Sequence, residues 1–222
     1  MLTRELLQSG RYPDSIDLPA EFRWTPARIE ASLAHTLATR PPEATDLWIF
    51  AYGSLMWNPL LDFDARQVAT LHGWQRRFCL RSVAGRGTPE QPGRMLGLVP
   101  SGSTQGEILR LDGRRLEAEL LMVWTREMVG GAYRPTWAPV TRADGSRAHA
   151  IAFVADPAQP LHEPDASVAT TAPIIARAAG SFGTNADYVF RLEAALRSAG
   201  LRDDYIESMA AALRRLGARA QD

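Results

Sequence analysis

The sequence predicts an α+β fold in which a strand-rich middle, closed into a small barrel, is flanked by helices at both ends. Apolar runs of strand length alternate with turn residues in the middle, whereas apolar residues recur at helical spacing near each end. At 222 residues, the chain has roughly the length of one domain. We expect a single domain over residues 1–222, with a helical N-terminal extension at 1–46, a strand-rich core at 47–155 and a helical C-terminal part at 156–222.

The N-terminal extension contains one clear helix signal. Thr25 is a suitable N-cap, and Pro26 takes the first helical position, where proline is well tolerated. Apolar residues then repeat at helical spacing, at Ile29, Leu33 and Leu37. Pro41 and Pro42 end this helix because proline cannot continue its hydrogen bonds.

The core begins with the compact apolar run Leu47–Tyr52, which Gly53 and Ser54 close. This pattern is typical of a buried strand that ends in a tight turn. Further strands are expected at Gln67–His72, Gln75–Ser82, Arg94–Val99 and Gln105–Leu111. The last two strands, Arg134–Thr141 and Arg147–Val154, flank Asp144-Gly145, which is a strong hairpin signal.

Helices are expected inside the core and after it. Arg115–Met128 carries an apolar stripe at helical spacing. Later helices are expected at Val168–Ala179, Asn185–Ala199 and Asp203–Leu216. Glycines at cap-like positions separate them, at Gly180, Gly183 and Gly200.

The charge balance argues against two classes of partner. The 25 basic and 25 acidic residues give a formal net charge of +0, and the sequence contains no basic block. Nucleic acids and anionic membrane surfaces need concentrated positive charge, so neither is an expected partner. All basic residues are Arg, which excludes a lysine Schiff base, a lysine-bound pyridoxal cofactor and a P-loop lysine.

Cysteine usage and the start of the chain predict a cytoplasmic protein. Cys79 has no second cysteine for an internal disulfide, which fits a reducing compartment. The first residues lack the apolar run of a signal peptide, and no stretch approaches the length of a membrane-spanning helix.

Several familiar sites do not fit the residues present. The histidines lack the spacing of zinc ligands: His35, His72, His149 and His162. The loop Gly85–Glu90 begins like a dinucleotide fingerprint, but Glu90 stands where the third glycine belongs. Ser54 lacks the GxSxG pattern of a hydrolase nucleophile. Cys79 lies between two apolar residues of an expected strand, as a core residue does.

Three segments combine residues in a less ordinary way. Trp48–Pro59 is a strand that enters a glycine turn, Arg86–Arg94 is a stiff Pro/Gly loop, and Thr125–Pro135 is a helix end with a carboxylate. Taken singly, they are more often a buried hairpin, a rigid connector, and a glycine C-cap with Glu127 on a solvated face. Their joint occurrence in this order is what favours a functional site.

With these segments the chain resembles the ChaC-like, glutathione-specific γ-glutamylcyclotransferases. The resemblance rests on YGSLMWNP at Tyr52–Pro59, RGTPEQPGR at Arg86–Arg94 and REMVGGAYRP at Arg126–Pro135, with weaker matches toward both ends. Ala51 departs from the family pattern, where Gly often precedes the tyrosine, but Ala is a mild change in a strand.

The resemblance implies a small mixed β-barrel with flanking helices, an enzyme without metal or cofactor, and a pocket at the YGSL turn. In the family this segment binds the γ-glutamyl group largely through backbone amides, and a glutamate acts as base and acid. By motif position, that catalytic residue is Glu127. The substrate-binding residues are Ile49, Phe50, Ala51, Tyr52, Gly53, Ser54 and Leu55. Tyr133 is a further candidate for lining the pocket, with core packing as the alternative.

These residue types suit an intramolecular cyclisation. The glutamyl α-amine attacks its own γ-carbonyl, and glutathione then gives 5-oxoproline and Cys-Gly. Holding the two groups in place contributes about 7–11 kcal/mol in well-oriented reactions. Glu127 can accept the amine proton and deliver it to the leaving nitrogen, and partial burial would raise its pKa toward the working pH. Backbone N–H groups of the glycine turn can hold the oxyanion.

Two alternatives stay open at this point. The chain could act on other γ-glutamyl amines or amino acids, or it could be a regulatory protein that binds a γ-glutamyl group without catalysis. The RGTPEQPGR loop favours the glutathione-specific branch, and the presence of Glu127 favours an enzyme.

Overall fold

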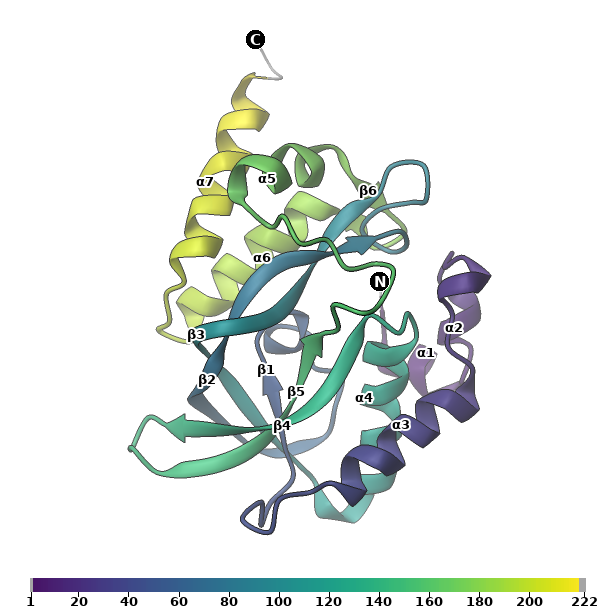
Figure 1. The fold of residues 1–222 in the computed structure, drawn as a ribbon, viewed down its shortest axis with the longest axis vertical. Helices are drawn as coiled ribbons and strands as arrows, with labels where there is room; N and C mark the ends of the chain where they lie inside the picture. The colour runs from purple at the N-terminus through teal and green to yellow at the C-terminus, as the bar shows by residue number, and fades with distance from the viewer. Residues whose placement is uncertain (1, 220–222) are drawn as a thin grey trace.

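A closed five-stranded barrel forms the centre of the molecule (Figure 1). The computed structural model describes residues 2–219, so the ends of the expected domain, 1 and 220–222, lie outside the described residues. The barrel strands are β1 (Trp48–Ala51), β2 (Phe63–Ser82), β3 (Gly93–Leu111), β4 (Tyr133–Arg142) and β5 (Arg147–Ala155), in the order β1-β3-β2-β4-β5. Neighbours are antiparallel except β1 and β5, whose parallel pairing at Ile49 and Ile151 closes the barrel. The predicted α+β class with a small mixed barrel is confirmed.

Two pairs of expected strands are in fact two long strands. The segments Gln67–His72 and Gln75–Ser82 both belong to β2, and Arg94–Val99 and Gln105–Leu111 both belong to β3. Gly73 and Gly102 lie where the two halves meet, with φ of 81° and 58°. Glycine adopts these angles at little cost, so the strands bend at a bulge without ending. The predicted breaks were therefore wrong.

The N-terminal segments cover one side of the barrel. They are α1 (Arg4–Gln8), α2 (Tyr12–Ser15), the 3-10 turn η1 (Ala20–Phe22) and α3 (Pro26–Ala38). The hydroxyl of Thr25 accepts the Arg28 N–H at 3.3 Å, which confirms the predicted cap of α3. All three α-helices pack on α4 and lie beside it in Figure 1.

Helix α4 (Leu116–Met128), preceded by η3 (Gly113–Arg115), confirms the helix expected inside the core. Its apolar face packs on the barrel: the Trp124 ring meets that of Phe153 on β5 edge to face, with centroids 5.0 Å apart. This packing fixes the C-terminal end of α4 against the barrel.

The C-terminal helices form a separate group at the upper left of Figure 1. They are α5 (Val168–Arg177), α6 (Asn185–Ser198) and α7 (Asp204–Arg219), and α5 and α6 both pack on β3. Gly180 and Gly183 are not the separate caps that the sequence predicts. They lie in a two-stranded ladder, β6 (Ala179–Gly180) and β7 (Gly183–Thr184), because α5 already ends at Arg177. Gly200 follows the C-cap of α6 with φ of 71°, as predicted.

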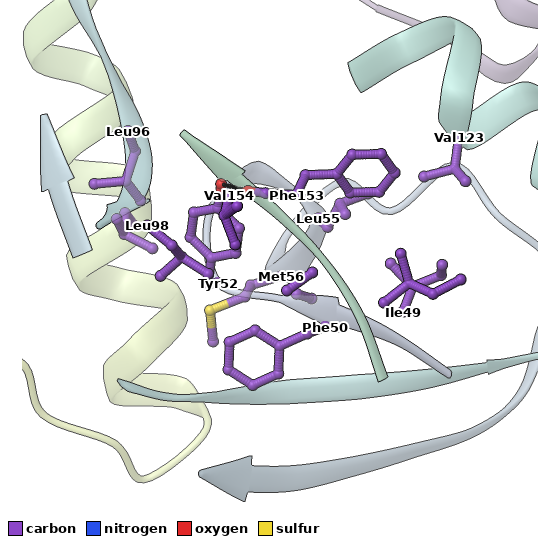
Figure 2. Close-up of a cluster of buried hydrophobic side chains, with 14 of the residues drawn as sticks. Ile49, Phe50, Tyr52, Leu55, Met56, Leu96, Leu98, Val123, Phe153 and Val154 are labelled. Atoms are coloured by element: carbon purple, nitrogen blue, oxygen red, sulfur yellow. Dashed lines mark hydrogen bonds between the residues drawn. The ribbon is translucent and has the colours of Figure 1, made fainter. Parts of the chain in front are cut away.

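The core of the barrel explains why β1 is apolar throughout. Ile49, Phe50 and Ala51 are fully buried, so both faces of this strand lie inside the protein. Figure 2 shows side chains of β1 and of the following turn packed with others from β3, α4 and β5. The core thus holds the end of β1 rigidly. Among the described residues, no helix has the length and apolarity needed to cross a bilayer.

Candidate active site

A cavity of about 530 Å³ opens where β1 ends. All three segments singled out in the sequence reach it, although they are far apart in the chain. Its lining includes Tyr52, Gly53, Ser54 and Leu55 from the turn after β1, Arg86 from the stiff loop, and Arg126, Glu127 and Tyr133 from α4 and the start of β4. The joint occurrence of the segments therefore has a spatial basis.

Gly53 is required by the close approach of α6. A Cβ built on Gly53 would lie 2.7 Å from the hydroxyl of Tyr188, a separation that real Cβ atoms do not show. The 3-10 turn η2 (Ser54–Met56) begins directly after it. The first amides of such a helix have no acceptor within it, so they are available as donors to a ligand.

A buried arginine holds the main chain of this turn from the barrel side. Arg76, 1% exposed, donates from Nε to the carbonyl oxygen of Tyr52 at 2.8 Å and also donates to the Gln105 carbonyl. Its Nη1 lies 2.9 Å from a carboxylate oxygen of Asp203, beside the start of α7. The hydroxyl of Tyr52 donates to the Phe153 carbonyl at 2.6 Å. Both ends of Tyr52 are thus fixed.

A second arginine holds the turn from the α4 side. Arg126 Nη2 donates to Ser54 Oγ at 2.8 Å, and Nη1 donates to the carbonyl oxygens of Asn58 and Pro59 at 2.6 and 3.0 Å. Its Nε lies 3.1 Å from Oε1 of Glu127. One guanidinium therefore ties the YGSL turn to the neighbouring carboxylate.

Glu127 lies in the last turn of α4, with 16% of its side chain exposed. Burial raises the pKa of this carboxyl above its ordinary value of 4.5, and the charge of Arg126 opposes the increase. A carboxylate that is partly desolvated yet reaches a cavity is a typical acid–base group. Glu127 therefore meets the condition of partial burial under which a carboxyl pKa rises toward the working pH.

The glycine pair after α4 turns the chain into β4. Gly131 has φ of 60°, and a Cβ there would lie only 1.9 Å from Nε1 of Trp24. A side chain at this position would displace the Trp24 indole or the turn. The second glycine of REMVGGAYRP is thus explained by packing close to Glu127.

The stiff loop is pinned by Asn185 at the start of α6. Its side-chain oxygen accepts the Arg94 N–H at 2.7 Å, and its nitrogen donates to the Arg94 carbonyl at 2.9 Å. A Cβ on Gly93 would lie 2.4 Å from this oxygen, so the loop needs glycine here. The RGTPEQPGR loop and the start of α6 therefore belong to one structural unit.

Arg86 brings positive charge to the cavity together with Arg191 of α6. Arg86 Nη1 and Arg191 Nε lie 3.1 and 2.8 Å from the same oxygen of Asp187. The two guanidiniums and one carboxylate leave one positive charge in excess. This part of the cavity suits a carboxylate.

The expected site residues divide into two groups. Tyr52, Gly53, Ser54, Leu55, Glu127 and Tyr133 line the cavity, whereas Ile49, Phe50 and Ala51 are fully buried in β1 and do not. These three residues belong to the buried strand that leads into the turn. The hydroxyl of Tyr133 donates to the Leu96 carbonyl at 2.7 Å, and burial raises its pKa well above 10.0. Tyr133 therefore both lines the cavity and packs in the hydrophobic core.

Sequence reasoning did not single out Arg126, Arg76 or Tyr188. Arg126 was inside a quoted motif, and its position next to Glu127 was the available signal. Tyr188 ended one of the weaker matches toward the C-terminus, but no role was assigned to it. Arg76 carried no local signal, because its partners are brought to it only by the fold.

Two other groups named in the sequence lie apart from this cavity. Cys79 is 1% exposed, and burial raises its pKa to about 11, so it stays a thiol in the core. Within residues 2–219, His, Cys, Asp and Glu side chains form no group of three or more that could hold a metal ion. A metal-free reaction remains a prediction.

The fold and the cavity define a family of proteins. The profile of the ChaC-like protein family matches residues 47–216, more than half of the chain, so the chain belongs to that family. A glutathione-specific gamma-glutamylcyclotransferase of Escherichia coli (strain K12) is 47% identical over 201 residues, which cover 90% of this chain and 87% of that protein. The human glutathione-specific gamma-glutamylcyclotransferase 1 is 32% identical over 162 residues, covering 69% of this chain and 71% of the human protein.

A solved structure has the same fold. The crystal structure of a gamma-glutamyl cyclotransferase specific to glutathione from yeast aligns with a TM-score of 0.70 and 19% sequence identity. The alignment covers 76% of this chain and 96% of the yeast chain. The barrel and its flanking helices are therefore a shared architecture.

Proposed function

We propose that this chain is a glutathione-specific γ-glutamylcyclotransferase in which Glu127 is the catalytic base and acid. The arrangement of Arg126 carries the proposal, because its guanidinium holds both Glu127 and the YGSL turn at one cavity. The identity of 47% to the bacterial enzyme supports glutathione as the substrate.

The turn after β1 would receive the γ-glutamyl group. Its γ-carbonyl oxygen would point toward the backbone amides between Gly53 and Leu55. The turn that carries them is rigid because Arg76 and Arg126 hold it from two sides. Donors that are fixed before the reaction stabilise a developing oxyanion without reorganising. The serine hydroxyl itself is bound to Arg126, which supports a binding role for Ser54 and not a nucleophilic one.

Glu127 would move one proton between two nitrogens. The α-amine forms a bond to the γ-carbon, and the carboxylate of Glu127 takes the proton that this nitrogen loses. The same carboxyl then gives the proton to the cysteinyl nitrogen as its bond to the γ-carbon breaks. Atoms balance without water, and the products are 5-oxoproline and Cys-Gly.

The cationic part of the cavity would receive the leaving dipeptide. Arg86 and Arg191 have Asp187 as a shared partner, so one positive charge remains for the glycyl carboxylate. The reacting end of the substrate would then lie at Glu127 and its far end at α6. In this orientation, Arg86 and Arg191 would hold the peptide carboxylate.

The remaining features of the proposal follow from the sequence. We propose that the reaction needs no metal or cofactor, that the protein acts in the cytoplasm and that nucleic acid is not a partner. We also propose one functional domain, with residues 47–155 as the catalytic core, 1–46 as an extension and 156–222 as the C-terminal part.

Mass spectrometry of the purified protein with glutathione tests the proposed function. The expected products are 5-oxoproline and Cys-Gly in equal amounts. A competition between glutathione and γ-glutamyl-alanine separates the two enzyme classes, and glutathione is expected to be consumed first. Tight binding of glutathione without any product would instead identify a regulatory protein.

A further inference from the structure

Residues 2–24 lie outside the part of the chain that the family profile matches, yet they contribute to the cavity. Leu2 and Tyr12 line it together with Glu127 and the YGSL turn. Both residues come from short segments that pack on α4, the helix that carries Glu127. The N-terminal segment is therefore part of the wall of the site.

A buried ion pair fixes one end of this segment. Arg4 Nη1 donates to Oε2 of Glu119 at 3.0 Å and to the Leu60 carbonyl at 2.8 Å, and its Nη2 lies 3.0 Å from Asp62. The Glu119 side chain is only 1% exposed. An unpaired carboxylate at that depth is strongly unfavourable, so the pair specifies where α1 sits. The carbonyl of Leu2 also accepts from the Asn58 side chain at 3.5 Å.

Trp24 fixes the other end. Its main-chain N–H donates to the Val129 carbonyl at 2.9 Å, and its indole ring covers Gly131 in the turn after α4. The Arg28 guanidinium stacks on the Trp24 ring at 3.9 Å from the centroid. The segment between Arg4 and Trp24 is thus held against the helix end that carries Glu127.

Tyr12 lies between these two anchors, and its hydroxyl has no hydrogen-bond partner among the described residues. The residue is 6% exposed, at the start of α2. Within residues 2–219, no side chain or main-chain group forms a hydrogen bond with the Tyr12 hydroxyl, although this residue lines the cavity. A largely buried phenol that lines a cavity, and whose hydroxyl has no partner among the described residues, is suited to pair with a ligand.

We infer that Tyr12 is a substrate-binding residue whose hydroxyl donates to the α-carboxylate of the γ-glutamyl group, an inference that rests on the proposed function. The α-carboxylate and the attacking amine share one carbon atom, so a donor beside Glu127 reaches the carboxylate when the amine reaches Glu127. The methylene groups of the glutamyl chain would pack on Leu2.

The electrostatics of the site agree with this role. Burial raises the pKa of Tyr12 to about 12, and the charges of Arg126 and Glu127 also act on it. The phenol therefore remains protonated at neutral pH and can donate. A hydrogen bond from a neutral donor to a charged acceptor contributes about 1.5–3 kcal/mol, which corresponds to about a tenfold effect or more.

Tyr12→Phe in the full chain tests the inference, with Tyr205→Phe as a matched control. Tyr205 is another largely buried tyrosine, but its hydroxyl bridges Phe78 and Ala166 away from the cavity. Tyr12→Phe should lower kcat/KM for glutathione about tenfold or more. It should also raise the inhibition constant of 5-oxoproline, which retains the α-carboxylate, by a similar factor. Its melting temperature should stay at the wild-type value.

Tyr205→Phe should do the opposite, lowering the melting temperature while kcat/KM stays within about twofold of wild type. If Tyr12→Phe keeps both kcat/KM and the inhibition constant within twofold, the inference is wrong. It is also wrong if activity falls only in proportion to the folded fraction. Absence of 5-oxoproline with the wild-type protein would refute the proposed function itself, which separates the two failures.

Discussion

The guanidinium of Arg126 lies 3.1 Å from the carboxylate of Glu127, its neighbour in the sequence. Successive residues of an α-helix are separated by about 100° around its axis, so adjacent side chains ordinarily diverge. Here both bend toward the cavity at the end of α4, where Arg126 also holds Ser54. The position of Glu127 and that of the YGSL turn are therefore both tied to one side chain.

Arg126→Met should disturb both parts of the site. The loss of its bonds to Ser54 and to the Asn58 and Pro59 carbonyls frees the turn, and we expect kcat/KM to fall about 10²-fold. Arg126→Lys should not recover the activity, because an ammonium cannot form the same fork of bonds. Arg115→Met, an exposed arginine just before α4, is the control and should remain within twofold of wild type. Full activity of Arg126→Met would contradict this role.

The pH profile of Arg126→Met gives an independent test. The charge of Arg126 lowers the pKa of Glu127, while burial raises it. Removing that charge leaves burial unopposed, so the pKa rises further. Because the ionised carboxylate is the base, the acid limb of kcat/KM should move to higher pH than in wild type. A shift to lower pH, or no shift, would show that this limb does not report Glu127.

Glu127→Gln should nearly abolish turnover while binding is largely kept. Gln preserves the shape but cannot carry a proton, and general acid–base catalysis typically supplies about 10²–10⁴-fold. Glu117→Gln, at an exposed position of the same helix, is the matched control and should leave kcat unchanged. Steady-state kinetics with glutathione, together with calorimetric binding, provide the measurement. Turnover of Glu127→Gln within a few-fold of wild type would refute the assignment.

Glu127→Gln should also stabilise the fold, by an amount that increases with pH. The pKa of Glu127 is raised above 4.5 by burial, so the folded protein keeps a proton that the unfolded chain releases. Its stability therefore falls as pH rises from 4.5 through the folded pKa, and the full penalty is present above that value. Glu127→Gln removes the penalty. Below pH 4.5 the melting temperature of Glu127→Gln should equal that of wild type. At pH 8 it should be higher, by about 2–4 °C for each kcal/mol of unfolding free energy that the substitution restores. If Glu127→Gln were less stable than wild type, and more so at pH 8 than at pH 4, this account of the Glu127 pKa would be contradicted.

The buried pair of Arg4 and Glu119 should behave as a unit. Arg4→Met leaves the Glu119 carboxylate without its cation, and we expect the free energy of unfolding to fall by about 3 kcal/mol. The double variant Arg4→Met with Glu119→Leu should recover most of this loss, because no buried charge remains. Denaturant unfolding of the wild type, of Arg4→Met, of Glu119→Leu and of the double variant measures the coupling. Additive losses in the double variant would show that the two residues act separately.

Much of the fold could be predicted because its signals are local. The cap at Thr25, the stripe in Arg115–Met128 and the Asp144-Gly145 hairpin each predict an element that the structure confirms. The strands β2 and β3 were divided because Gly73 and Gly102 are typical of turns as well as of bulges. Helices α1 and α2 span 5 and 4 residues, and so short a segment has no periodicity to detect. They are held by tertiary contacts such as that of Arg4.

Only the site residues that lie within a recognisable motif could be predicted from the sequence. Glu127 and the turn from Tyr52 to Leu55 stand in quoted motifs, and the structure places them at one cavity. Arg76 lies 127 residues from Asp203, and its other partners are main-chain carbonyls. No sequence pattern marks an arginine whose acceptors are backbone oxygens. Tyr12 was missed for the same reason, since only the docking of α1 and α2 brings it to the cavity.

The most direct test of the central claim concerns the nucleophile. If the glutamyl α-amine attacks its own γ-carbonyl, glutathione acetylated on that nitrogen must be inert, although its scissile amide is unchanged. Unmodified glutathione in ¹⁸O-water should give 5-oxoproline without label, because no solvent oxygen enters the product. Cleavage of the acetylated substrate, or ¹⁸O in the glutamyl product, would show that water is the nucleophile and would contradict the cyclotransferase mechanism.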